Sequence, residues 1–87
     1  MSDISIMIAD DQSIVRDGLK IIMNMEENFN VVGTCESGRL IHGFVDRISP
    51  KVVLMDILIQ GELQIETVRQ LKKNYKEIVI IILKRFT

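Results

Sequence analysis

Three aspartates that directly follow apolar runs are the residues best placed to do chemistry in this sequence. Asp10 and Asp11 follow the run Ile4–Ala9, and Asp56 follows the run 52–55. Both runs are continuous rather than alternating in hydrophobicity, which is typical of strands buried on both faces in a parallel sheet. Ligands of such sheets bind in the crevice beyond the carboxyl ends of the strands, so neighbouring strands would bring the three carboxylates together there.

Carboxylates held so close together repel one another strongly unless a positive charge compensates them. An oxygen-liganded divalent cation is the simplest such charge. The alternative is that all three aspartates are ordinary solvated residues at the ends of strands. The expected convergence of Asp10, Asp11 and Asp56 favours a metal site.

The elements that would position these aspartates alternate between strand and helix along the chain. Predicted strands cover Ile4–Ala9, residues 29–34, Val52–Asp56 and residues 77–83, and predicted helices cover residues 13–25, 37–48 and 63–74. Ser13 and Ser37 are expected to cap the first two helices. Pro50 ends the second helix, because the residue before a proline disfavours helical geometry. This alternation predicts an α/β fold, a parallel sheet with right-handed crossovers and helices on both faces.

The composition is that of one small domain. The chain has 87 residues, 47% of them are apolar, and the formal net charge is −1. No basic stripe indicates nucleic-acid binding by this segment itself, and Arg16 is interpreted as part of a solvated helix face. The single cysteine, Cys35, fits a reducing compartment. No signal-peptide pattern is present and the longest apolar stretch is far too short to span a bilayer, so we expect a cytoplasmic protein without membrane contact.

Four stretches resemble a known family: residues 6–12 (IMIADDQ), 15–19 (VRDGL), 31–33 (VVG) and 52–57 (VVLMDI). Together they resemble the receiver domain of bacterial two-component response regulators, most closely receivers of the NarL/FixJ subfamily with a LuxR-type output domain. The resemblance extends over the whole chain. It implies a flavodoxin-like (CheY-like) sheet of strand order 2-1-3-4-5, of which this chain would supply an incomplete version, 2-1-3-4.

The resemblance also implies a function within a phosphorelay. A sensor histidine kinase would transfer a phosphoryl group to Asp56, and the phosphorylated receiver would control transcription through a DNA-binding output domain that is not present here. Asp10 and Asp11 would bind Mg2+, with Asp11, Asp56 and the backbone carbonyl of Leu58 as direct ligands. A carboxylate is a workable nucleophile toward phosphorus, and the metal would neutralise charge on the transferring group. The chain would thus accept phosphate without being an enzyme itself.

The sequence departs from the family pattern at three places. The loop of residues 59–64 lacks the proline, the helix-capping aspartate and the second glycine that the family commonly has there. Lys84 stands where the family has a threonine or serine whose hydroxyl contacts the phosphoryl group. Residues 1–87 are therefore expected to form a receiver domain without the last helix, strand and helix of the family and without a DNA-binding domain.

Two expectations arise from these departures. Lys84 is either a resident countercharge beside the acidic pocket or a residue that points into solvent. Without a fifth strand, the predicted strand 77–83 is an exposed, β-branched edge, and such edges pair with other chains. We therefore expect self-association through this strand.

Two other classes of function are weighed against the phosphoacceptor. A non-phosphorylatable receiver remnant would act as a protein–protein interaction or dimerisation module, which Lys84 and the altered loop favour. The intact Asp10, Asp11 and Asp56 favour phosphate acceptance instead. A flavin- or nucleotide-binding protein is disfavoured, because the acidic loop after the first strand would repel a phosphate rather than hold it with glycine amides.

Overall fold

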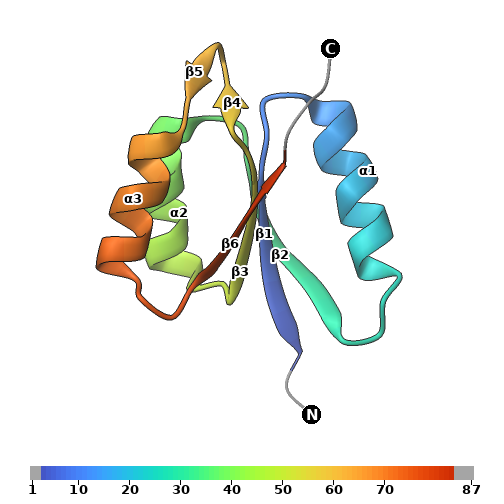
Figure 1. Ribbon diagram of the computed structural model, residues 1–87. Helices are drawn as coiled ribbons and strands as arrows, with labels where there is room; N and C mark the ends of the chain where they lie inside the picture. Colours follow the sequence, from blue (N-terminus) through green and yellow to red (C-terminus); the bar gives the residue numbers. More distant parts are fainter. Residues whose placement is uncertain (1–2, 84–87) are drawn as a thin grey trace.

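The computed structural model describes residues 3–83, and a four-stranded parallel sheet forms its centre (Figure 1). β1 (Ile4–Ala9) pairs with β2 (Phe29–Cys35) on one side and with β3 (Val52–Asp56) on the other. β3 also pairs with β6 (Val79–Leu83), which gives the order β2-β1-β3-β6. β6 is the fourth strand predicted from the sequence, so the flavodoxin-like sheet and its order 2-1-3-4 are confirmed.

Helices cover both faces of the sheet (Figure 1). α1 (Ser13–Asn24) lies on one face, while α2 (Ile41–Ile48) and α3 (Ile65–Asn74) lie on the other. Successive side chains of a strand point to opposite faces, so β1 and β3 each contribute to two apolar clusters. Ile6, Ile8 and Leu54 pack with Leu19 and Met23 of α1, whereas the cluster on the other face contains Met7, Ala9, Val53, Met55, Ile41, Val45 and Leu71. Burial on both faces explains why these strands read as continuous apolar runs.

The two predicted serine caps have different outcomes. Ser13 is the first residue of α1 rather than its cap, and the cap residue Gln12 makes no side-chain capping bond. Ser37 does cap, since its Oγ accepts a hydrogen bond from the Arg39 N–H at 3.3 Å. The element that it caps is a 3-10 turn, η1 (Gly38–Leu40), which leads into α2.

A short antiparallel hairpin follows β3 and was not predicted. β4 (Leu58–Ile59) pairs with β5 (Glu62–Leu63) across a two-residue turn. The turn residues Gln60 and Gly61 both have positive φ, 54° and 78°. Positive φ at both positions is what the common two-residue hairpin turn requires. α3 therefore begins at Ile65 instead of the predicted residue 63.

β6 forms one edge of the sheet, and α1 leaves part of β6 uncovered. The register places Val79 beside Val52 and Ile81 beside Leu54, so both side chains share the face that α1 covers elsewhere. They are nevertheless 52% and 46% exposed, because α1 lies over β1 and β2. Within residues 3–83, no helix combines the length and the apolar character needed to cross a membrane.

Candidate functional site

The three predicted aspartates converge at the carboxyl ends of β1 and β3. Asp56 is the last residue of β3, and Asp10 and Asp11 directly follow β1. The two strands are neighbours in the sheet, with Ala9 beside Met55. Each aspartate offers one carboxylate oxygen, and these three oxygens all lie within 4.8 Å of one another. The structure thus brings together the residues that the sequence singled out.

Backbone N–H groups orient all three carboxylates. Gln12 donates to Asp10 Oδ1 at 2.9 Å, and Leu58 donates to Asp56 Oδ1 at 3.0 Å. The Gln60 N–H donates to Asp11 Oδ2 at 2.8 Å. The first two bonds are local, each joining a carboxylate to the N–H two residues later in the chain. The third joins the loop after β1 to the turn of the β4–β5 hairpin. Hydrogen bonds from N–H donors to a carboxylate are strong ones, so they hold the three carboxylates in fixed orientations.

The donor set fits Mg2+. Asp10 and Asp56 are buried and Asp11 is partly exposed, so an ion would be held by protein on one side and remain open to water on the other. Carboxylate oxygens suit a hard cation such as Mg2+, which usually keeps several of its waters. Leu58 lies at the rim of this cluster through its bond to Asp56. The role of its carbonyl as a ligand remains a prediction.

Gln64 lies at the end of the altered loop, directly before α3, and makes no side-chain capping bond to the helix. This buried residue stands where the family has its second glycine, and its N–H donates to the Ile57 carbonyl at 2.8 Å. Its side-chain Nε2 donates to the Glu62 carbonyl at 2.9 Å, and its Oε1 accepts from Thr67 Oγ1 at 2.9 Å. The same side chain packs against Gly38, where an added Cβ would collide with it. A glutamine thus occupies space that a glycine would leave empty.

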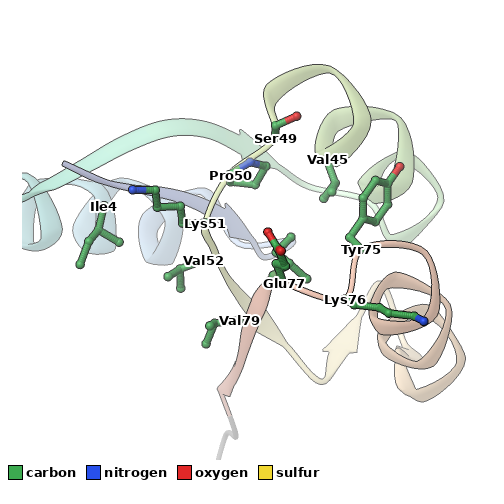
Figure 2. A pocket seen from close by; sticks show the side chains of 11 residues that line it. Ile4, Val45, Ser49, Pro50, Lys51, Val52, Tyr75, Lys76, Glu77 and Val79 are labelled. Atoms are coloured by element: carbon green, nitrogen blue, oxygen red, sulfur yellow. The ribbon is translucent and has the colours of Figure 1, made fainter. Parts of the chain in front are cut away.

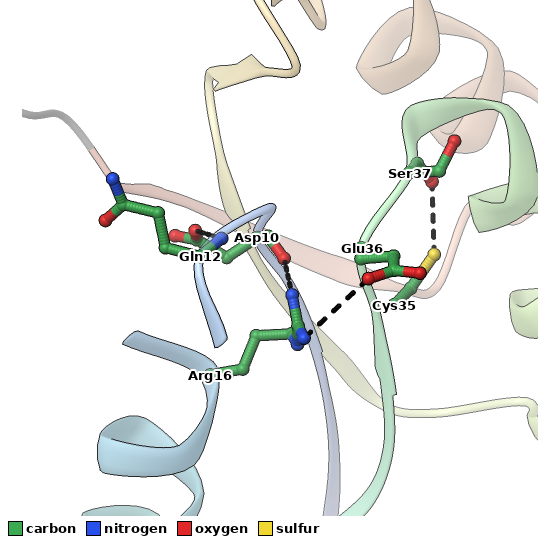
Figure 3. A network of polar contacts seen from close by, with 6 residues as sticks. All are labelled: Asp10, Gln12, Arg16, Cys35, Glu36 and Ser37. Carbon is green, nitrogen blue, oxygen red and sulfur yellow. Dashed lines mark hydrogen bonds and ion pairs between the residues drawn. The ribbon is translucent and has the colours of Figure 1, made fainter. Parts of the chain in front are cut away.

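Arg16 is the site residue that the sequence interpretation missed. Its side chain is only 17% exposed, so the expected solvated position is wrong. Figure 3 shows its guanidinium between the turn after β1 and the end of β2. Nη1 donates to the Asp10 carbonyl at 2.8 Å, and Nη2 lies 3.8 Å from Glu36 Oε2. Lys84, for which a countercharge and a solvated position were both considered, lies outside the described residues.

A large apolar cavity lies at the other end of the sheet (Figure 2). Its volume is about 760 Å³, and Ile4, Val52 and Val79, at the amino ends of three strands, contribute to its lining. Pro50 and Tyr75 line it as well. The acidic cluster and this cavity are therefore separate features, at opposite ends of the strands.

The comparison with known families decides the assignment. The model of the response regulator receiver domain family matches residues 6–86. This chain belongs to that family. The predicted resemblance to receivers with a LuxR-type output domain is confirmed by the relatives as well.

The relatives of this receiver are longer proteins, and the match covers only part of each. Transcriptional regulatory protein DegU of Brevibacillus brevis is 35% identical over 80 residues, which are 92% of this chain and 34% of DegU. The RcsB response regulator of Salmonella typhimurium has a TM-score of 0.88 at 25% identity, covering 97% of this chain and 44% of that one. A LuxR-family response regulator from Aurantimonas sp. SI85-9A1 has a TM-score of 0.89 at 24% identity, covering 99% and 61%. This receiver chain therefore spans between one third and two thirds of their lengths.

Proposed function

We propose that this receiver accepts a phosphoryl group on Asp56 from a sensor histidine kinase in the cytoplasm. Mg2+ would be held by Asp11, Asp56 and the Leu58 carbonyl, with Asp10 beside them. In a whole regulator, phosphorylation would bias the conformation of the receiver and so control a DNA-binding output domain. The observation that carries this proposal is the cluster of three carboxylate oxygens within 4.8 Å on a receiver fold.

The residues around Asp56 suit its role as nucleophile. Its burial excludes water from one side, and the Leu58 N–H holds the carboxylate in one orientation. An Asp56 oxygen would bond to phosphorus as the bond from phosphorus to the kinase histidine nitrogen breaks, which yields an acyl phosphate on this chain and a neutral histidine. The bound metal would neutralise charge on the transferring group. Asp10 and Asp11 would keep it beside Asp56.

Labelling by a small phosphodonor tests this proposal directly. The chain is incubated with acetyl phosphate with and without Mg2+, and its intact mass is measured. We expect one added phosphoryl group that requires Mg2+ and is absent from Asp56→Ala. Asp17→Asn, which alters an exposed aspartate of α1, is the matched control and should be labelled like the unaltered chain. A folded sample without label would favour the non-phosphorylatable interaction module instead.

We also propose that the chain associates with itself through β6. The Val79 N–H donates to the Lys51 carbonyl, and the Leu83 carbonyl accepts from the Ile57 N–H. These bonds direct the backbone of residues 79 and 83 toward β3. Because the direction alternates along a strand, Ile80 and Ile82 direct their N–H and C=O groups toward the outer edge.

A second copy could pair with this edge in antiparallel register. With Ile81 opposite its own counterpart, Ile80 of one copy would exchange hydrogen bonds with Ile82 of the other. Residues 79–83 carry no charge, so this symmetric pairing places no like charges opposite one another. Sedimentation velocity over a range of concentrations tests the proposal. A mass that stays monomeric at every concentration would refute it.

A further inference from the structure

Arg16 has an unusual environment for an arginine on a helix surface (Figure 3). Its guanidinium reaches back from α1 to the carbonyl of Asp10, six residues earlier, at 2.8 Å. On its other side it lies 3.8 Å from the carboxylate of Glu36, directly after β2. Most of the Arg16 side chain is thereby shielded from solvent, with 17% of it exposed. No residue of α1 is completely buried.

The bond from Arg16 acts on the peptide group that joins Asp10 to Asp11. The carbonyl of Asp10 and the N–H of Asp11 belong to one planar unit. On the preceding side, the Asp10 N–H donates to the Cys35 carbonyl of β2 at 2.9 Å. The Gln12 N–H closes the turn on the Asp10 carboxylate. Arg16 therefore fixes the unit that sets the direction in which Asp11 leaves the strand.

We propose that Arg16 is a positioning residue for the Mg2+ site, which it prepares by holding the peptide between Asp10 and Asp11. This inference rests on the proposed function, because it assumes that these aspartates bind Mg2+. A site that is ordered before binding does not have to be ordered by the ligand, and its affinity is higher for that reason. Glu36 contributes little, since its side chain is 67% exposed and exposed ion pairs are weak.

Removing Arg16 has two opposite effects on the affinity for Mg2+. Loss of the guanidinium releases the turn, so that binding must order it, and the affinity falls. Loss of a positive charge near the aspartates strengthens their attraction for a cation, and the affinity rises. Salt weakens the second effect, because the Debye length is only about 3 Å at 1 M ionic strength, although charges that are partly buried are screened less than exposed ones. The loss of the hydrogen bond, which is the first effect, does not depend on this screening. The positioning effect is therefore measured at high concentrations of KCl.

The experiment compares Arg16→Met with Arg69→Met, which removes the same charge from an exposed pair with Glu66 on α3. Mg2+ is titrated in about 1 M KCl while NMR follows the amides of Gln12 and Gln60, which donate to Asp10 and Asp11. Outer-shell partners of metal ligands typically contribute tenfold or more to affinity. Because Arg16 contacts the backbone of Asp10 and not its carboxylate, we expect a smaller effect. Arg16→Met should raise the dissociation constant for Mg2+ about three- to tenfold over that of Arg69→Met. Without Mg2+, the Gln12 amide should exchange with solvent about tenfold faster in Arg16→Met, and Mg2+ should restore its protection.

Equal dissociation constants and equal Gln12 exchange in the two variants would overturn the inference. If Arg16→Met does not fold, Arg16→Lys takes its place. It retains the positive charge but has a compact ammonium group in place of the planar guanidinium. We expect a dissociation constant raised about two- to threefold in Arg16→Lys, and wild-type affinity with wild-type exchange would overturn the inference. Failure of the unaltered chain to bind Mg2+ would contradict the proposed function and the inference together. Binding that is insensitive to Arg16 would contradict the inference alone.

Discussion

The backbone N–H of Gln60 donates a 2.8 Å hydrogen bond to Oδ2 of Asp11, 49 residues earlier in the chain. This bond joins the turn of the β4–β5 hairpin to the loop after β1. The same hairpin begins at Leu58, whose N–H holds Asp56. One short hairpin therefore orients two of the three carboxylates, and its turn geometry should affect both the stability of the chain and its affinity for metal.

Replacing Gly61 with alanine tests the importance of this turn. Gly61 has φ of 78°, a conformation that costs an L-residue about 1–2 kcal/mol. We expect Gly61→Ala to lower the free energy of unfolding by about that amount and to weaken Mg2+ binding, as measured by urea denaturation and metal titration. Gly18→Ala in α1 is the control, since a Cβ there meets nothing within 4 Å. That variant should gain roughly 0.5–1 kcal/mol of stability and keep its Mg2+ affinity.

Mg2+ should stabilise the folded chain through the aspartate cluster. A ligand that binds only the folded state at ten times its dissociation constant raises the free energy of unfolding by about 1.4 kcal/mol. We expect the melting temperature of the unaltered chain to rise with Mg2+ and to return to its starting value with EDTA. Asp11→Asn should lose most of the rise, while Asp17→Asn should keep it. A rise of the same size in Asp11→Asn would exclude Asp11 as a ligand.

Self-association through β6 should be sensitive to charge at Ile81. In the proposed symmetric pairing, Ile81 lies opposite its own counterpart, so Ile81→Lys would place two positive charges together. We expect this variant to sediment as a monomer at concentrations where the unaltered chain forms dimers. Ile14→Lys provides the comparison, because Ile14 is an exposed isoleucine of α1, away from β6. If both variants remain dimeric, the interface lies elsewhere.

Gly38 and Gln64 should be coupled energetically. A Cβ at Gly38 would collide with the Gln64 side chain, and forced overpacking typically costs about 1–3 kcal/mol. We expect Gly38→Ala to lower the free energy of unfolding by that amount, and the cost of the same substitution to be at least about 1 kcal/mol smaller when residue 64 is glycine. Chemical denaturation of the two single variants and the double variant measures this coupling energy. Additive effects would show that the contact does not restrict residue 38.

The sequence determined the sheet and the position of the aspartates. Ile4–Ala9 and Val52–Asp56 read as strands because both are buried on two faces, and every residue that follows such a strand lies at one edge of the sheet. Adjacent strands then bring Asp10, Asp11 and Asp56 together without any detail of side-chain packing. The family resemblance rested in part on these same residues, and it was confirmed.

Only the tertiary structure decided what holds the aspartates in place. The hairpin turn at Gln60 and Gly61, the packing of Gln64 on Gly38 and the burial of Arg16 all depend on a partner from a distant part of the chain. Ile22 shows the same limit, since it belongs to the apolar pattern of α1 and is nevertheless exposed. Periodicity predicts which face of an element is apolar. Whether that face meets another element depends on packing, which local sequence does not specify.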